Sequence, residues 1–211
     1  MRRTVAAGVA CAVVALAAAG CSGGDQDMPG LTASPTQTAT PAETPTPTPS
    51  ETPTSIAGTV VDLSDPELGI VFEDVPELSG DEADVHNWIA TFEVEYWRTL
   101  TTNAVSPGFA VFASPEEQAK IAGFAEQNTT AGLEIGGTYH VSIDDIVVNG
   151  DTATGLACDD YTDVTLARPD GPRSLADEGI DVPRLIEFTL ARSDRGDGLW
   201  TVVMSDGVGS C

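Results

Sequence analysis

The sequence predicts an α+β domain in which N-terminal helices pack on a curved antiparallel β-sheet. Apolar residues recur at the helical period between residues 85 and 100, whereas beyond residue 136 they alternate with a period of two. The alternating half is interrupted by turn sequences, of which Asn149-Gly150 is the strongest short hairpin signal. A block of helices followed by a block of strands is typical of the α+β class.

Two helices are expected in the first half of the domain. The first is predicted to start with a capping box, Ser79 with Glu82. The second is predicted to start with Ser114 as N-cap and Pro115 at the first helical position, with Glu117 reaching back to the cap as a second capping box. The second helix should end near Asn128. The first helix carries an apolar stripe that we interpret mainly as core packing against a sheet. The stripe consists of Val85, Trp88, Ile89, Phe92, Tyr96 and Leu100.

The predicted strands form a meander in the second half of the domain. The strand from Tyr139 to Val148 loses its phase at Asp144-Asp145, which predicts a β-bulge there. A short helical turn is expected at residues 174–178, within a polar loop. Further strands are expected at 153–158 with a bent continuation to 166, at 186–190 and at 200–204. The short apolar runs at 59–61 and 69–72 are expected to form short strands or extended cover.

The start of the chain has the layout of an export signal. Arg2 and Arg3 precede an apolar run, residues 5–19, that is too short to span a bilayer. The run leads into Ala-Ala-Gly-Cys, which resembles a bacterial lipobox. This resemblance implies that residues 1–20 are a cleaved signal peptide and that Cys21 carries a lipid anchor with palmitate-type acyl chains, on the outer face of the cell membrane. An ordinary secretory signal peptide is the alternative.

Residues 21–56 are predicted to be a disordered linker between that anchor and the folded domain. The segment is rich in Ser, Thr and Pro, repeats Thr-Pro from Thr44 to Pro49, and has almost no large apolar residue. Because proline favours the polyproline II conformation, we expect a semi-extended tether. The folded domain is then residues 57–211, which is long enough to bury a core of its own.

The composition is strongly acidic. The chain has 33 Asp and Glu against nine Lys and Arg, for a formal net charge of −24 at pH 7. Arg2 and Arg3 are among the nine, so the chain after Cys21 is more acidic still. This balance argues against nucleic acid, anionic lipid head groups and other polyanions as partners. The acidic residues are interpreted chiefly as a solvated surface rather than as a binding site.

Two cysteines remain once the signal peptide and Cys21 are set aside. An exported protein meets an oxidising compartment, so we expect Cys158 and Cys211 to form a disulfide that pins the C-terminus to an internal strand. A metal site on the same two cysteines is the weaker alternative, because no histidine lies near either of them in the sequence.

The order of elements and two of the strands together resemble a known family. The segment IVVNGDTA at 146–153, which leads to Cys158-Asp159, and the closing LWTV at 199–202 are similar to those of lipoproteins of high-GC Gram-positive bacteria (actinobacteria) that carry an NTF2-like domain. The similarity covers residues 80–211. It implies the cone of the superfamily that includes SnoaL- and ketosteroid-isomerase-like proteins, a bent sheet wrapped around helices. Its internal pocket hosts catalysis in some relatives, whereas others only bind or scaffold.

The resemblance implies that any pocket chemistry would come from Asp, Tyr and His side chains that point into the cone. If the cone is hollow, we expect Trp88, Phe92, Tyr96 and Tyr139 to line its pocket. The alternative is that these aromatic side chains fill the interior, which would leave only the surface for binding.

Neither histidine is expected to serve the pocket. Tyr139 shares one face of its strand with Val141 and Ile143 and so should point inward, which turns His140 outward. His86 lies on the flank of the first helix and is interpreted as a surface residue. We therefore assign no catalytic residue and no cofactor from the sequence.

Four acidic residues are weak candidates for a metal site. Asp144-Asp145 and Asp159-Asp160 lie on either side of the predicted turn at Asn149-Gly150, at comparable heights on the paired strands. Carboxylate ligands of this kind suit Ca²⁺. A solvated strand edge is the favoured alternative, because the sequence has no calcium-binding loop.

Three hypotheses about function remain open. The first is a non-catalytic envelope lipoprotein whose cone binds a small apolar molecule or an envelope protein. The second is an isomerase or hydro-lyase that uses an inward Asp and Tyr. The third is a wall-interaction module stabilised by Ca²⁺. The first is preferred, because the sequence offers no convincing His-Asp pair for the second and no calcium loop for the third.

Overall fold

The computed structural model describes residues 58–180 and 182–211 of the chain. The predicted signal peptide, the lipidated Cys21 and the linker lie outside these residues. A short strand, β1 (Ile70–Phe72), precedes helices α1 (Asp81–Thr102), α2 (Phe109–Phe112) and α3 (Pro115–Ala131). The elements that follow are β2 (Glu134–Gly137), β3 (Tyr139–Asn149), β4 (Thr152–Asp160), β5 (Val164–Arg168), β6 (Gly171–Arg173), the 3₁₀ turn η1 (Ala176–Glu178), β7 (Arg184–Arg192) and β8 (Trp200–Ser210). Among the described residues, no helix is both long and apolar enough to cross a bilayer.

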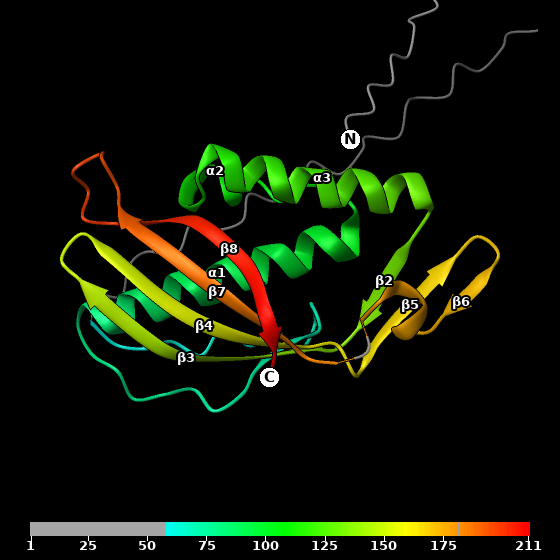
Figure 1. Cartoon of the computed structure of the whole chain (residues 1–211), viewed down its shortest axis with the longest axis horizontal. Coiled ribbons are helices and arrows are strands. Elements are labelled where there is room, and N and C mark those ends of the chain that lie inside the picture. Colours follow the sequence, from blue (N-terminus) through cyan, green and yellow to red (C-terminus); the bar gives the residue numbers. More distant parts are fainter. Residues whose placement is uncertain (1–57, 181) are drawn as a thin grey trace, which may run out of the picture. The chain divides into compact units, whose positions relative to one another are not determined.

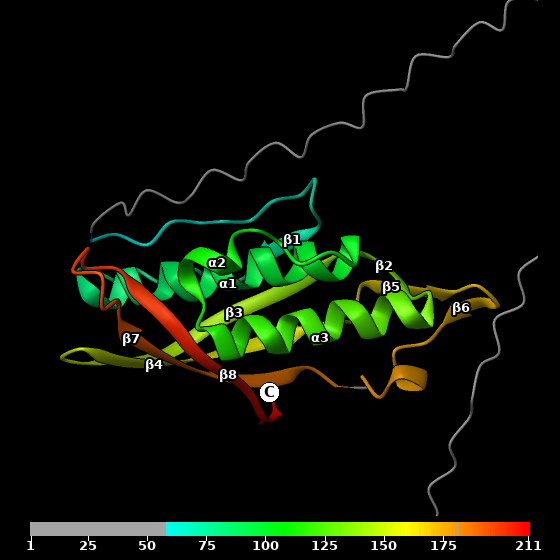
Figure 2. The same ribbon diagram turned by 90° about the horizontal axis from the view of Figure 1, so that it is seen from above.

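The strands form two sheets. The main sheet has the order β1-β3-β4-β7-β8, and a small sheet has the order β2-β5-β6. Helices α1 and α3 lie along one face of the main sheet, and the small sheet lies beyond the C-terminal end of α3 (Figures 1 and 2). Apart from β1, neighbouring strands of the main sheet are antiparallel. The predicted α+β arrangement, with helices packed on a curved and largely antiparallel sheet, is confirmed.

Strands β1 and β5 differ from the prediction. β1 pairs with β3 in parallel, whereas the sequence predicts a wholly antiparallel sheet. β5 pairs with β2 instead of continuing β4. The chain turns directly after β4, because Asp160 Oδ1 accepts a hydrogen bond from the Thr162 N–H at 2.8 Å and the Val164 N–H donates to the Tyr161 carbonyl at 2.9 Å. The turn directs the chain out of the main sheet and into the small one.

Of the two alternatives expected for 59–61, a short strand or extended cover, the structure has extended cover. Of these residues only Thr59 pairs, in an isolated bridge with Ser79. The segment instead runs along α1, where the Val61 N–H donates to Asn87 Oδ1 at 2.9 Å and Asn87 Nδ2 donates to the Thr59 carbonyl at 2.8 Å. Because this segment covers part of α1, the helix is buried on more sides than its apolar stripe predicts.

The two predicted helix starts have different outcomes. Ser114 caps α3 as expected, since its hydroxyl accepts a hydrogen bond from the Glu117 N–H at 3.2 Å. The prediction of a capping box at Ser79 is wrong, because Gly80 is the N-cap of α1 and no side chain makes a capping hydrogen bond there. Acidic residues stabilise the first turn of α1 through the helix dipole instead. These residues are Asp81, Glu82 and Asp84.

Strands β3 and β4 form the predicted hairpin. Asn149 pairs with Thr152 across the turn, and Gly150 there has a φ of 61°, which glycine adopts without strain. The pairing shifts register between Asp144 and Val147, so the predicted β-bulge is confirmed. The half of β3 before the bulge presents Tyr139, Val141 and Ile143 to the core.

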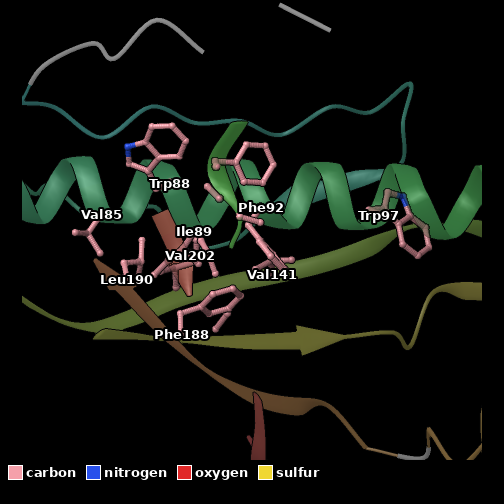
Figure 3. Close-up of a cluster of buried hydrophobic side chains, with 14 of the residues drawn as sticks. Val85, Trp88, Ile89, Phe92, Trp97, Val141, Phe188, Leu190 and Val202 are labelled. Atoms are coloured by element: carbon pink, nitrogen blue, oxygen red, sulfur yellow. The ribbon is translucent and has the colours of Figure 1, made fainter. Parts of the chain in front are cut away.

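The core lies between α1 and the main sheet (Figure 3). Side chains from one face of α1 pack there on side chains of β3, β7 and β8. Trp88 points to α2 instead, where its ring centroid lies 6.0 Å from that of Phe112. The labelled core residues that join helix and sheet are Val85, Ile89, Phe92, Val141, Phe188, Leu190 and Val202.

The predicted disulfide is present. Cys158 on β4 is bonded to Cys211, which follows β8 directly, and their Cα atoms are 6.0 Å apart. Because β7 lies between β4 and β8 in the sheet, the bond ties the end of the edge strand to the middle of the sheet.

Candidate functional site

Two buried carboxyl groups lie between α1 and the main sheet. Glu93 on α1 is 1% exposed and Asp159 on β4 is 3% exposed. Glu93 follows Ile89 by four residues and precedes Trp97 by four, so the helical repeat places it on a buried face of α1. Asp159 pairs with Val141 of β3 and shares its inward direction. Each layer of the fold thus contributes one acidic side chain to the interior.

Three tyrosines surround these carboxyl groups. The Tyr139 hydroxyl donates to Glu93 Oε2 at 2.8 Å, and the Tyr161 hydroxyl donates to Asp159 Oδ2 at 3.2 Å. The rings of Tyr139 and Tyr161 stack with centroids 4.9 Å apart. Tyr96, one helical turn after Glu93, hydrogen-bonds to Tyr161. We call these five residues, Glu93, Tyr96, Tyr139, Asp159 and Tyr161, the acid–tyrosine cluster.

Burial favours the protonated forms of the groups in the cluster. Desolvation raises the pKa of Asp159 to about 7, although hydrogen bonds from Tyr139 and Tyr161 and the positive charge of Arg184 lower it. Desolvation, together with the nearby Asp159 carboxylate, raises the pKa of Glu93 well above its ordinary value. Burial also raises the pKa of each of the three tyrosines. The interior therefore presents hydroxyl groups that donate hydrogen bonds near neutral pH.

One oxygen of the cluster has no protein partner. Asp159 Oδ1 is buried and makes no hydrogen bond within the described residues. An unpaired buried polar atom costs about 1–3 kcal/mol, so its presence in a core needs a reason. Asp159 is part of the lining of the adjacent cavity, although the unpaired Oδ1 itself is buried.

A cavity of about 220 Å³, here the first cavity, opens beside the cluster. Four members of the cluster, all except Tyr139, form its polar wall. Its apolar walls include Phe92 of α1, Ile121 of α3 and Phe188 of β7. Lys120 of α3 and residues 205–207 of β8 also line it. The combination of apolar walls with a few convergent polar groups is typical of small-molecule sites.

Polar contacts between α3 and β8 hold one side of the first cavity together. The Ser205 hydroxyl donates to Glu117, and Lys120 donates to the Ser205 carbonyl and forms ion pairs with Glu117 and Asp206. The Glu117 side chain therefore contacts β8 and does not reach back to the cap of α3, as the predicted capping box would require. The reason is that Ser205 lies within its reach.

A second cavity of about 310 Å³ lies toward the small sheet. Its distinctive lining is apolar and includes Leu100 of α1, Ile135 of β2 and Val164 of β5. The two cavities share four lining residues, which therefore stand where one cavity meets the other. These residues are Tyr96, Phe124, Tyr161 and Arg184.

The structure separates the four residues expected to line a pocket. Phe92 and Tyr96 line the first cavity, whereas Trp88 and Tyr139 do not. Trp88 lies one turn earlier on α1 and packs on α2. The Tyr139 ring stacks on that of Tyr161, and its centroid lies 5.1 Å from that of Trp97. The Tyr139 hydroxyl donates its hydrogen bond to Glu93.

The acidic pairs considered for a metal site are not brought together. The register places Asp144 opposite Leu156 and Asp159 opposite Val141, so the pairs lie at different heights on the two strands. Asp159 faces the core, while the adjacent Asp160 faces outward and bonds to the turn after β4. No group of three or more metal-ligating side chains occurs within residues 58–180 and 182–211.

The histidines have opposite outcomes. His140 faces outward as predicted, with Nδ1 2.9 Å from Glu73 Oε1 and Nε2 3.3 Å from Asp163 Oδ2. The prediction that His86 lies at the surface is wrong, because its side chain is buried and only 2% exposed. Helix α1 is covered on several sides, and burial lowers the pKa of this histidine.

Two residues near the cavities were not predicted from the sequence. Glu93 could have been found, since it continues the helical spacing from Ile89 to Trp97 and an acidic residue at such a position is unusual. Arg184 had no such signal, because only the tertiary fold brings the start of β7 beside Tyr96 and Asp159.

Comparison with known proteins finds similarity at the level of structure. Neither a family model nor a curated protein sequence matches this chain. The intermembrane space region of the chloroplast protein ARC6 is similar over 62% of this chain and 98% of that one, with 13% identity and a TM-score of 0.45. A ketosteroid isomerase candidate from Shewanella frigidimarina is similar over 58% and 92%, with 14% identity and a TM-score of 0.33.

A third solved structure is a candidate calcium/calmodulin-dependent protein kinase type II association domain from Thiobacillus denitrificans. It is similar over 55% of this chain and 89% of that one, with 14% identity and a TM-score of 0.34. These similarities concern the arrangement of helices and sheet, and no functional statement follows from them. The architecture itself, helices packed on a curved and largely antiparallel sheet, is the fold class that the sequence predicts.

Proposed function

We propose that this chain is an envelope lipoprotein, anchored to the outer face of the cell membrane through Cys21, whose domain binds a small and largely apolar organic molecule. The proposal of a lipid anchor is supported by the lipobox-like segment before Cys21 and by the charged and apolar segments that precede it. The linker to residue 56 holds the domain away from the bilayer. The net charge of −24 disfavours nucleic acid as a partner.

The observation that carries the binding proposal is the first cavity. Side chains of α1, α3 and β7 give it apolar walls, and its polar lining includes carboxyl and phenol groups whose raised pKa values favour the protonated form. Such groups donate hydrogen bonds to a carbonyl, ester or carboxylate oxygen, while the apolar walls exclude water around that contact. The site therefore suits a molecule that is mostly hydrocarbon and carries at least one hydrogen-bond acceptor.

Fluorescence titration with 8-anilinonaphthalene-1-sulfonate tests this proposal on residues 22–211. Saturable binding to one site is expected. Gly207→Phe places a ring in the first cavity, because a Cβ built at Gly207 points to Ile186, another lining residue, and meets nothing closer than 3.9 Å. We expect this variant to bind the probe at least about tenfold more weakly.

Gly209→Phe is the matched control. It adds the same ring to β8 two residues further on, where a Cβ meets nothing within 4 Å and no lining of the first cavity is involved. This variant should bind the probe as the wild type does. Absence of saturable binding, or equal loss in the two variants, would refute a binding site in the first cavity.

Acid–base catalysis is the second candidate function, and Asp159 is the observation that favours it. A carboxyl group with a pKa of about 7 that lines a cavity can accept a proton from a carbon acid. Tyr161 or the protonated Glu93 would donate a hydrogen bond to the adjacent carbonyl oxygen of the substrate. This chemistry belongs to isomerases and hydro-lyases, and it uses residues of the chain alone.

Deuterium uptake by the ketone 2-tetralone in D₂O tests the catalytic candidate. An enzyme should accelerate exchange at the carbon next to the carbonyl group, with a rate that rises with pH through about 7 as Asp159 ionises. Asp159→Asn should abolish the acceleration, and Asp160→Asn should retain it. Exchange at the buffer rate from pH 5 to pH 9 would leave binding alone as the function.

A further inference from the structure

The two cavities differ in the kinds of side chain that line them, although Gln127, Asn128 and Glu178 also place polar groups in the second. The first contains all the carboxyl groups of the acid–tyrosine cluster, together with Lys120 and Ser205. The second adds mostly aliphatic side chains, such as Leu133, Leu166 and Ile180. A ligand that occupied both would need a polar part at one end and a hydrocarbon part at the other.

Arg184 marks the place where the two linings meet. It lines both cavities, and its guanidinium lies close enough to Asp159 to lower the pKa of that carboxyl group. Its Nη2 donates to the Gly179 carbonyl at 3.0 Å, and no carboxylate lies within ion-pair distance in the described part of the chain. Arg98, Lys120, Arg168, Arg173 and Arg192 each form an ion pair with a carboxylate.

Arg184 is solvent-exposed, and within the described residues it and Arg195 are the two Arg or Lys side chains that form no ion pair with a carboxylate. The donors of Arg184 match the geometry of a carboxylate, which accepts two parallel hydrogen bonds from a guanidinium. Phe124, Tyr96 and Tyr161 beside it supply apolar ring faces at the same place. The local charge therefore favours one small anionic group even though the whole surface repels polyanions.

We propose that the two cavities together bind an elongated amphiphile, with a single carboxylate head held at Arg184 beside the acid–tyrosine cluster and a hydrocarbon chain in the second cavity. This inference rests on the proposed binding function and specifies its ligand class. The head pairs with Arg184 and accepts hydrogen bonds from the protonated cluster. The chain lies among the aliphatic side chains between α1, α3 and the small sheet.

Calorimetric titration of residues 22–211 with saturated fatty acids tests whether the hydrocarbon part of the ligand binds in the second cavity. From hexanoate to decanoate, each added methylene should raise the affinity about fourfold, as expected for its transfer from water into an apolar cavity. Val164→Phe narrows only the second cavity. It should remove the dependence on chain length while the naphthalene sulfonate probe still binds in the first cavity, which shows that the variant is folded.

Ligands of equal length but different charge test the head. Decanoate should bind at least about tenfold more tightly than decanol and decylamine. Nonspecific attraction to an acidic protein would give the opposite order, with the amine tightest. Arg184→Gln should remove the preference for decanoate and leave decanol unchanged. Arg195→Gln, at an exposed turn where this arginine forms no ion pair within the described residues, should change nothing.

The outcomes separate this inference from the proposed function. Probe binding in the first cavity without a chain-length effect, or without preference for the carboxylate, would overturn the amphiphile and leave small-molecule binding standing. Failure of the probe and of every fatty acid to bind would overturn both.

Discussion

Asp159 and Asp160 are neighbours on β4 whose carboxyl groups have opposite surroundings. The alternation of the strand turns Asp159 into the core and Asp160 to the surface. Burial raises the pKa of Asp159 to about 7, whereas a hydrogen bond from Thr162 lowers the pKa of Asp160. The direction of one side chain thus decides which of the two carboxyl groups holds a proton near neutral pH.

Asp159 should make the free energy of unfolding depend on pH. Its pKa is about 7 in the folded protein and returns toward the ordinary 3.8 on unfolding. Between these values the folded state binds more protons than the unfolded state, so this group's contribution falls as pH rises from about 4 to about 7 and is constant above. We expect the free energy of unfolding, measured in urea, to fall less from pH 5 to pH 8 in Asp159→Asn than in the wild type.

Asp160→Asn is the control for this measurement. Because the pKa of Asp160 is lowered, its contribution is lost only below about pH 4, and the variant should follow the wild type between pH 5 and pH 8. The buried His86 and the high net charge add their own pH dependence to all the proteins, so the comparison is between variants. Equal losses in wild type and Asp159→Asn would contradict a buried, protonated Asp159.

At the residue scale, the sequence correctly predicts whether some side chains point into the core or outward. The alternation around Val141 correctly places Tyr139 inside and His140 outside. The burial of His86 was not predicted, because a helix that is covered on several sides also buries residues outside its apolar stripe. The meeting of Arg184 with the cluster depends on residues from distant parts of the chain, for which no local pattern exists.

At the scale of elements, the two helix starts make a matched test. Ser114→Ala removes the hydroxyl that accepts from the Glu117 N–H, and it should lower the free energy of unfolding by about 1 kcal/mol. Ser79→Ala should change it by less than about 0.5 kcal/mol, because Ser79 is not the N-cap of α1. Urea unfolding of both variants measures the difference. A larger loss at Ser79 would mean that the capping box forms after all.

Elements defined by local signals were predicted well. The turn at Gly150 and the bulge at Asp144 each follow from a few adjacent residues, and so does the N-cap at Ser114. The parallel pairing of β1 with β3 and the small sheet were missed, because both depend on partners far along the chain. The cavities lie where these nonlocal elements meet the helices, which is why the sequence could not show that the cone is hollow.

At the scale of the whole molecule, the disulfide should contribute most through the unfolded chain. Cys158 and Cys211 are 53 residues apart, and closing a loop of that size is worth about 4 kcal/mol in the chain-entropy description. The double variant Cys158→Ser, Cys211→Ser should lose about that much in urea unfolding. Loss of less than about 1 kcal/mol would mean that β8 holds its place without the bond.

The lipid anchor is also a property of the whole molecule. In cells, Cys21→Ser should abolish incorporation of labelled palmitate and prevent cleavage before residue 21, since the thiol is the acceptor of the lipid. Cys11→Ser should do neither, because Cys11 lies within the expected signal peptide. Unchanged labelling of Cys21→Ser, or none in the wild type, would favour an ordinary secretory signal.

An experimental crystal structure of residues 22–211 grown with decanoate tests the central claim most directly. Electron density is expected for a carboxylate at Arg184, next to Tyr161 and the Asp159 carboxyl group, and for a chain that continues past Phe124 toward Val164. A structure in which Phe92, Tyr96 and Phe124 close the space between α1, α3 and the sheet, with no density for decanoate, would contradict a ligand-binding interior.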